Sequence, residues 1–123
     1  MYRYNAKVVR VIDGDTVDAD IDLGFDIKIK KRIRLADIDA PESRTRNLAE
    51  KKAGLASKDR LIQLLDGAAN VFELESTEVG KYGRVIGKLH ISKLEGRESI
   101  TQVCINDILV KEGYAVEYDG GKR

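Results

Sequence analysis

Two neighbouring stretches of alternating residues constrain the fold of this chain more than any other feature. Residues 16–23 alternate apolar side chains with three aspartates, at positions 18, 20 and 22. After Gly24, residues 27–35 carry isoleucine at 27, 29 and 33, and the opposite face carries Lys28, Lys30, Arg32 and Arg34. A period of two is that of a half-buried β-strand, and opposite charges on facing strands form stabilising pairs. The sequence therefore predicts a charge-paired antiparallel hairpin.

The remaining elements follow from turn residues and apolar spacing. Residues 6–12 predict a first strand, because Val8, Val9, Val11 and Ile12 supply β-branched side chains. Asp13-Gly14-Asp15 interrupts this strand with a turn or bulge. Apolar residues recur at helical spacing over 46–66, and Asp66-Gly67 ends that predicted helix. We expect strands at 70–76 and 84–91, a loop at 77–83, a hairpin turn at 95–97 and a short helix at 105–111 that Gly113 stops. Several strands around one long helix favour a small β-barrel of the OB kind.

Length and composition indicate the class of protein. A chain of 123 residues fits one domain, 1–123, of which 118–123 form a frayed polar tail. With 42% hydrophobic and 35% charged residues, the chain is typical of a soluble globular protein. No apolar run reaches membrane-spanning length, and the first residues lack the apolar stretch of a secretory signal. We therefore expect no membrane partner, and a protein that is cytoplasmic or released by lysis.

The net charge and the single cysteine and histidine limit the functions that the chain can have. The net charge is only +1, whereas non-specific nucleic-acid binders usually carry a basic excess, so any attraction for a polyanion must be local. Cys104 is the single cysteine, which excludes an internal disulfide and favours a buried small hydrophobe. The single histidine, His90, is expected to pack on a strand, and we assign it no role.

Residues 34–42, at the end of the second alternating run, combine the groups needed for phosphodiester chemistry. The segment places Arg34, Asp37, Asp39 and Glu42 around Pro41. A guanidinium binds anionic oxygens bidentately, clustered carboxylates hold a hard metal ion, and a further carboxylate can take a proton from water. Charged residues also crowd the ends of ordinary strands, so this segment needs support from the rest of the chain.

Two further clusters supply such support. Residues 13–16, Asp-Gly-Asp-Thr, place carboxylates around a glycine, although a surface turn would explain them as well. Residues 81–84, Lys-Tyr-Gly-Arg, place two cations and a phenol before a strand, although a solvated loop is the simpler interpretation. Strict alternation puts Asp15 on the side of Val17 and Arg34 opposite Ile33. These two side chains can share a site only if the sheet coils or a bulge at Gly14 redirects one of them.

Together these segments resemble the thermonuclease (staphylococcal nuclease-like) family. The matching signatures are residues 11–16, residues 34–35 with 39–42, and residues 81–84, with a weaker fourth over 105–115. The resemblance implies a mainly β, α+β fold: a five-stranded OB-fold barrel with one long and one short helix. It also implies a sequence-non-specific nuclease that cleaves single-stranded or locally open DNA and RNA, uses Ca²⁺ and leaves 3′-phosphates. The family's long C-terminal helix has no counterpart here, which points to a homo-oligomer or a partner chain in its place.

The resemblance also implies a role for individual residues. Asp15 and Asp39 would bind Ca²⁺ together with the main-chain carbonyl of Ala40, and Asp13 would lie nearby. Glu42 would be the general base. The remaining site residues would contact the substrate: Arg34 and Arg84 would clamp the phosphate, Lys81 and Tyr82 would touch a flanking phosphate, and Tyr118 would be a candidate for stacking on a base.

Two other functions remain open at this point. The first is a catalytically inactive OB module of the same family that binds nucleic acid or protein. The second is a structural subunit that uses the basic strand face. The presence of Asp15, Arg34, Asp39, Glu42 and Arg84 together favours the nuclease, because motif matches become credible when their context agrees.

Overall fold

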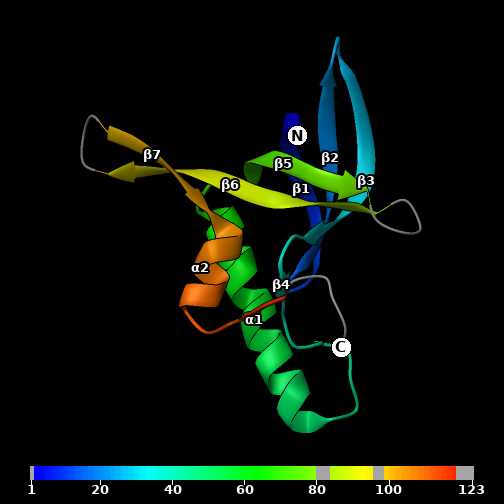
Figure 1. Ribbon diagram of the computed structural model, residues 1–123, viewed down its shortest axis with the longest axis vertical. Helices are drawn as coiled ribbons and strands as arrows, with labels where there is room; N and C mark the ends of the chain where they lie inside the picture. Colours follow the sequence, from blue (N-terminus) through cyan, green and yellow to red (C-terminus); the bar gives the residue numbers. More distant parts are fainter. Residues whose placement is uncertain (1, 80–83, 96–98, 119–123) are drawn as a thin grey trace.

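The computed structural model describes residues 2–79, 84–95 and 99–118 and shows a closed β-barrel with two helices packed at one end (Figure 1). The elements along the chain are β1 (Tyr2–Asp13), β2 (Thr16–Gly24), β3 (Ile27–Leu35), β4 (Ile38–Asp39), α1 (Leu48–Asp66), β5 (Val71–Val79), β6 (Val85–Glu95), β7 (Ser99–Cys104), α2 (Ile105–Lys111) and β8 (Val116–Glu117). The predicted long helix over 46–66 and short helix over 105–111 are both present. The two-residue strands β4 and β8, which pair with each other, were not predicted.

Strand pairing closes the barrel. The sheet order is β3-β2-β1-β5-β6-β7, and β3 also pairs in parallel with β6 through Ile33–Leu35. That pairing joins the first and fifth strands of the order, so the predicted five-stranded OB-type barrel is confirmed. Strand β7 continues from β6 outside the closed ring, and the two extend to one side of the molecule (Figure 1).

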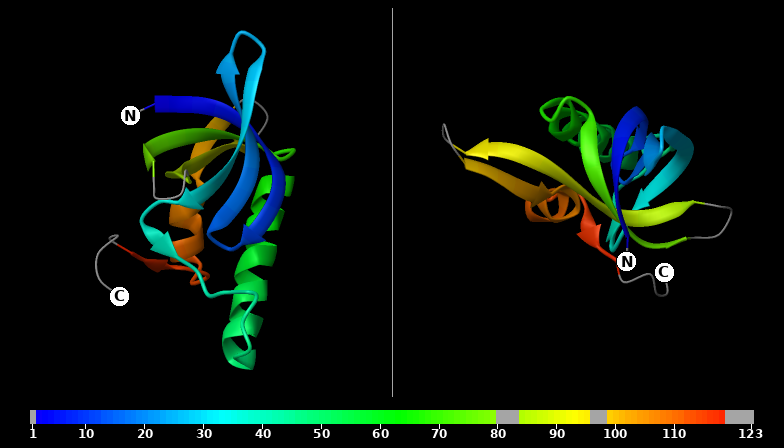
Figure 2. Two further views of the ribbon diagram at one scale, coloured as in Figure 1. Left: turned by 90° about the vertical axis from the view of Figure 1, so that its right-hand side faces the viewer. Right: turned by 90° about the horizontal axis from the view of Figure 1, so that it is seen from above.

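The predicted hairpin has the expected register. Asp18 faces Arg32, and the two lysines at 28 and 30 face the aspartates at 22 and 20. Its turn uses left-handed backbone at Gly24, Phe25 and Asp26, whose φ angles are 88°, 55° and 63°. The far end of the hairpin projects beyond the other strands, on the side away from α1 (Figure 2).

The core fills the barrel and the space between it and the helices. Its largest fully buried side chains come from six elements: Val17, Ile33, Leu35, Leu61, Leu65, Leu74, Leu89, Ile105 and Leu109. The fully buried leucines of α1, Leu61 and Leu65, lie in the second half of that helix, which covers the barrel end. The first half extends past the barrel, and its buried residues are the small Gly54 and Ser57. No described helix is long and apolar enough to cross a membrane.

A buried asparagine joins α2 to the strands where the barrel closes. The side chain of Asn106 accepts a hydrogen bond from Leu89 N–H (3.1 Å) and donates to the carbonyls of Ala36 (2.9 Å) and Gly87 (3.3 Å). Buried backbone groups need hydrogen-bond partners, and Asn106 supplies one to Leu89 N–H and one to the Ala36 carbonyl. Asn106 falls in the weak fourth sequence signature, from which we assigned it no role.

Candidate active site

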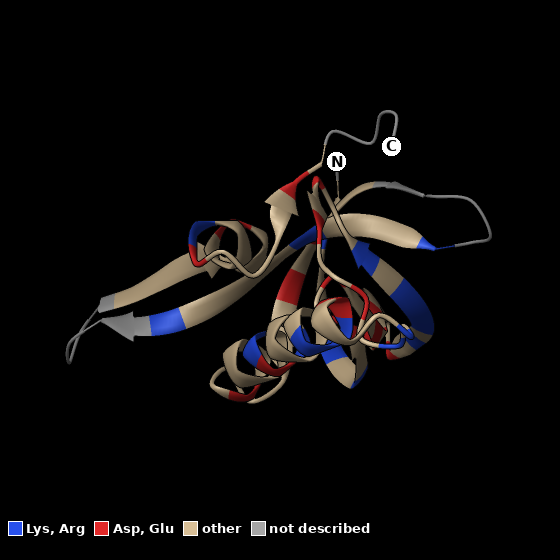
Figure 3. Cartoon of the chain, turned by 90° about the horizontal axis from the view of Figure 1, so that it is seen from below, with Lys and Arg blue, Asp and Glu red and all other residues tan. Residues whose placement is uncertain are grey.

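A cavity of about 550 Å³ lies where the β1–β2 turn, the end of β3, residues 40–42, α1 and residues 113–116 meet. Five carboxylates and two guanidiniums line it: Asp13, Asp15, Asp39, Glu42, Glu50, Arg34 and Arg84. In the view from below, basic and acidic residues of the described chain are interspersed (Figure 3). The excess of acids in this cavity is therefore a local feature, and it favours a cation.

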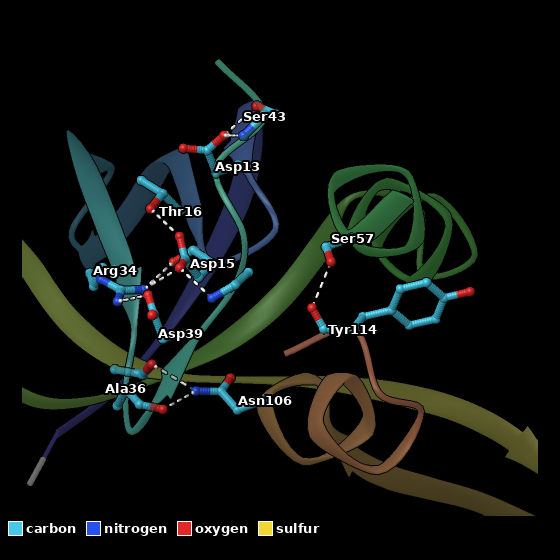
Figure 4. Close-up of polar contacts among 12 residues, drawn as sticks. Asp13, Asp15, Thr16, Arg34, Ala36, Asp39, Ser43, Ser57, Asn106 and Tyr114 are labelled. Atoms are coloured by element: carbon cyan, nitrogen blue, oxygen red, sulfur yellow. Dashed lines mark hydrogen bonds and ion pairs between the residues drawn. The ribbon is translucent and has the colours of Figure 1, made fainter. Parts of the chain in front are cut away.

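Asp15 is held in place by contacts to both its carboxylate and its main-chain carbonyl. One carboxylate oxygen, Oδ2, accepts the N–H of Ala40 (2.8 Å) and contacts Nη1 of Arg34 (2.8 Å), while Oδ1 accepts the hydroxyl of Thr16 (2.9 Å) (Figure 4). Its main-chain carbonyl accepts the N–H of Leu35 (2.8 Å). Asp15 is buried, and a buried carboxylate is tolerated when it is paired and hydrogen-bonded in this way.

The β1–β2 turn explains how Asp15 reaches Arg34. Gly14 and Asp15 form the turn itself, so the alternation that begins at Thr16 does not govern the Asp15 side chain. The β1–β2 register also shifts between Val11 and Asp13. Arg34 faces Thr16 across the β2–β3 pair. Residues that strict alternation places on opposite faces therefore share one site.

Arg34 bridges two carboxylates from different segments. Its Nη1 contacts Asp15, and its Nη2 donates to Oδ1 of Asp39 in β4 (3.3 Å). The side chain is 21% exposed, so the guanidinium is oriented by its partners and still faces the cavity. This two-pronged geometry is one that lysine cannot reproduce.

Glu42 is exposed and lies on a segment that is fixed on both sides. The next residue, Ser43, is buried, and both its N–H (3.2 Å) and its hydroxyl donate to Oδ1 of Asp13. The main-chain carbonyl of Glu42 lies against Gly54 of α1, where an added Cβ would come within 2.2 Å of that oxygen. Asp13 and Gly54 thus hold the main chain from which the Glu42 carboxylate projects.

A second close approach joins α1 to the turn that carries Asp15. A Cβ on Gly14 would come within 2.6 Å of the Cβ of Ser57. The hydroxyl of Ser57 donates to the main-chain carbonyl of Tyr114 (2.6 Å), which also lines the cavity. No role for Gly54 or Ser57 was predicted from the sequence. A glycine within a helical pattern was the available signal, since it often marks close packing.

Of the other residues predicted to contact the substrate, one lies in this cavity and one lies elsewhere. Arg84 is exposed and lines the same cavity. Lys81 and Tyr82 fall outside the described residues. Tyr118 lines a different hollow of about 1070 Å³ with Lys88 and residues of α2, and its N–H donates to the carbonyl of Asp37 (2.8 Å).

The oxygen atoms of this cavity could supply some, but not all, of the ligands of a hard cation. Within the described segments, no three His, Cys, Asp or Glu side chains are close enough to form a metal site by themselves. Asp15 and Asp39 are joined through Arg34, and Ala40, whose N–H bonds to Asp15, lines the same cavity. Carboxylate and main-chain oxygens are the ligands that Ca²⁺ takes, and it accepts waters for the rest of its six to eight ligands. The site therefore suits Ca²⁺ with water or substrate oxygens, and it lacks the side chains for a site built from protein alone.

Cys104 and His90 lie outside the cavity. Burial raises the pKa of the Cys104 thiol, which disfavours the reactive thiolate. The Nε2 of His90 lies 2.9 Å from Oε1 of Glu75, and this contact lowers the pKa of Glu75, with a smaller contribution from Arg3.

Most of the chain is similar in sequence to known proteins. A family model described as staphylococcal nuclease homologue matches residues 32–122. A micrococcal nuclease of Shigella flexneri is 34% identical over 116 residues, which cover 94% of this chain and 59% of the relative. The ParB protein of Escherichia coli is 32% identical over 91% of this chain and 56% of its own length. An uncharacterized endonuclease of Escherichia coli is 29% identical over 94% of this chain and 61% of its length, so the chain spans under two thirds of each relative.

Proposed function

The chain belongs to the staphylococcal nuclease family, and we propose that it is a Ca²⁺-dependent nuclease that cleaves DNA and RNA without sequence preference and leaves 3′-phosphates. One observation carries the proposal. The guanidinium of Arg34 contacts the carboxylates of Asp15 and Asp39 in a cavity that Glu42 and Arg84 also line. We further propose that residues 1–123 act as one domain.

Arg34 and Arg84 bind the scissile phosphate. Arg34 is already oriented by Asp15 and Asp39, so its N–H groups need little ordering when a phosphate enters. Arg84 is exposed on the same cavity and adds a second guanidinium. Guanidinium pairs match phosphate oxygens bidentately, and their charge stabilises the additional negative charge of the transition state.

Glu42 orients the attacking water and removes its proton. The water oxygen forms a bond to phosphorus while the bond from phosphorus to the 5′-oxygen breaks. The water proton passes to the Glu42 carboxylate, and the leaving 5′-oxygen takes a proton from solvent. The cleaved strand then ends in a 3′-phosphate and a 5′-hydroxyl. A carboxylate on a main chain fixed by Asp13 and Gly54 is suited to this role, because a general base must hold its position.

Asp15, Asp39 and the main-chain carbonyl of Ala40 would hold the Ca²⁺ ion. When bound, the ion would supply positive charge beside the phosphoryl oxygens. Asp13 contributes indirectly, since its carboxylate is bonded to Ser43. The number of protein ligands is small, so binding should be weak and should depend on water and substrate oxygens.

The substrate that fits best is single-stranded or locally open nucleic acid. The chain is nearly neutral, so electrostatic attraction must come from the few cations at the site. Lys81 and the hydroxyl of Tyr82 contact a flanking phosphate. Binding should still weaken as salt rises, because each phosphate contact releases a counterion.

A digestion assay tests the proposal. Single-stranded DNA, duplex plasmid and RNA are each incubated with the protein and Ca²⁺, or with a chelator, and the product ends are identified. We expect cleavage only with Ca²⁺, with 3′-phosphate ends, and with faster digestion of single strands. A variant that combines Arg34→Ala, Glu42→Ala and Arg84→Ala should be folded and inactive. Equal digestion by this variant and the wild type would refute the assignment, and binding without any cleavage would indicate an inactive module.

A further inference from the structure

Most of β3 lies at an open edge of the sheet. The parallel pairing with β6 covers only Ile33–Leu35, and residues 27–32 are paired with β2 on one side. No other described strand adjoins them. This part of the hairpin projects beyond the barrel on the side away from α1 (Figures 1 and 2).

The direction of the unpaired backbone groups follows from two hydrogen bonds at the end of the strand. Leu35 N–H bonds to Asp15 on the β2 side, and Ala36 N–H bonds to Gly87 on the β6 side. Successive residues of a strand point their backbone groups to opposite sides. Lys28, Lys30 and Arg32 therefore direct their N–H and C=O groups toward the open edge.

The outer face of the barrel alternates in charge from strand to strand. The charged residues of this face include Lys88 on β6, Glu73 and Glu75 on β5, Arg3, Lys7 and Arg10 on β1, Asp18, Asp20 and Asp22 on β2, and Lys28, Lys30 and Arg32 on β3. Ion pairs join neighbouring strands: Arg3 contacts Glu73 (2.6 Å) and Glu75 (3.1 Å), and Asp18 contacts Arg32 (2.9 Å) and Arg10 (3.5 Å). The alternation of acidic and basic strands stops at β3, where the cations have acidic neighbours only on the β2 side.

The other face of the same ribbon carries Lys31 and, toward the turn, exposed apolar residues. Leu23 and Ile27 are 46% and 56% exposed, and Phe25 at the turn is 98% exposed. Exposed apolar residues beside an unpaired strand edge favour the addition of another strand. The edge thus offers hydrogen-bonding groups, cations on one face and apolar side chains on the other.

We propose that the open edge of β3 binds an extended segment of a partner protein in which acidic residues alternate with apolar ones. The segment adds as a further strand, so that its backbone pairs with residues 28, 30 and 32. Its acidic side chains lie beside Lys28 and Lys30 and continue the alternation of charge. Its apolar side chains cover Ile27 and Ile29.

Charge argues against the two other occupants of this edge. A second copy paired edge to edge would bring the cations at 28, 30, 31 and 32 against their own counterparts. A nucleic-acid strand along the same cations would run beside Asp18, Asp20 and Asp22, which lie one strand away, about 5 Å. None of residues 27–32 lines the cavity of the proposed nuclease site, and Lys28 lies about 20 Å along the strand from Arg34, so the inference is independent of that site.

Binding of a synthetic peptide tests the charge requirement. The probe is a labelled eight-residue peptide that alternates glutamate with valine, and its affinity is measured by fluorescence anisotropy. We expect Lys28→Glu with Lys30→Glu to weaken binding at least tenfold. The matched control is Lys51→Glu with Lys52→Glu on exposed positions of α1, which should leave the affinity unchanged. Equal weakening by both double variants, or no binding to the wild type, would overturn the proposal.

A second measurement tests the strand pairing without altering the protein. Peptides N-methylated at alternate positions lose the N–H groups of one edge, and we expect one of the two methylation patterns to abolish binding. Amide exchange of Lys28, Lys30 and Arg32 should slow in the complex. Binding that survives both methylation patterns would overturn strand addition. Two other results would also overturn the proposal. One is self-association of the wild type that is lost in the variant with Lys28→Glu and Lys30→Glu, and the other is oligonucleotide binding that is lost in the same variant.

Discussion

Arg34 on β3 and Asp15 in the β1–β2 turn form an ion pair of 2.8 Å, although strand alternation assigns their side chains to opposite faces. The turn removes Asp15 from the alternation, and its carbonyl bonds to Leu35, next to Arg34. The same guanidinium reaches Asp39 after the chain has turned again. Arg34 thus joins two carboxylates from different segments, which is the basis of the predictions that follow.

Arg34→Ala should lower kcat about 10² to 10³-fold, because one charge-stabilising donor to the phosphoryl group is lost. Arg34→Lys should recover little of this loss, since an ammonium cannot contact Asp15, Asp39 and a phosphate in a planar fork. The measurement is kcat on single-stranded DNA. Arg32→Lys on the outer face is the control and should retain activity. Wild-type activity in Arg34→Lys would contradict the role given to the fork.

Glu42→Gln should lower kcat about 10² to 10⁴-fold, the usual contribution of a general base. The side chain is exposed, so the free energy of unfolding should change by less than about 0.5 kcal/mol. Both quantities are measured on the same preparation. Glu50→Gln replaces another carboxylate of the cavity and should change kcat little. If the two variants lose activity equally, Glu42 is not the base.

Gly54→Ala should impair catalysis by displacing Glu42. A methyl group at this position would lie 2.2 Å from the Glu42 carbonyl oxygen and 2.7 Å from the Ser43 nitrogen. A displacement of about 1 Å in a catalytic group can cost about 10²-fold in rate. Gly67→Ala, where the nearest atom would be 3.5 Å away, is the matched control. Combined with Glu42→Gln, Gly54→Ala should add no further loss, and additive losses would point to a different cause.

Asn106→Leu should destabilise the fold by about 2–5 kcal/mol, because Leu89 N–H and the Ala36 carbonyl lose a buried partner. The Gly87 carbonyl keeps its bond from Ala36 N–H. Urea unfolding measures the change, and Asp107→Leu at the neighbouring exposed position should have a much smaller effect. Equal stability of Asn106→Leu and the wild type would show that this network contributes little.

Asp18→Asn should reduce the sensitivity of the fold to acid. The hydrogen bond from Arg32, with smaller contributions from Arg10, lowers the pKa of Asp18 in the folded state. Because the folded pKa lies below the unfolded value of about 4, the unfolded state binds the proton first as pH falls. The stability from this group is present above pH 4 and is lost at lower pH. Urea unfolding from pH 6 to pH 3 should show a smaller decrease for Asp18→Asn, and parallel decreases would contradict this.

The hairpin and both helices could be predicted from local pattern. Alternating aspartates and cations specify the Asp18–Arg32 register, because a shift by one residue would move every side chain to the other face. The acidic and basic clusters could likewise be recognised as candidates for one site. Contacts between distant segments could not be predicted. The approach of Gly54 to Glu42 depends on how α1 packs against the loop, and no local pattern encodes that distance.

The sequence alone determined the strand and helix types, the register of the hairpin and the residue types available for chemistry, because these depend on short-range periodicity and side-chain chemistry. The tertiary structure decided which of those residues meet. Closure through Ile33–Leu35, the turn at Asp15 and the packing of α1 bring Arg34, Asp15 and Asp39 together and direct Tyr118 to a different hollow. Such placement arises from barrel closure and turn geometry, which only the folded chain as a whole defines.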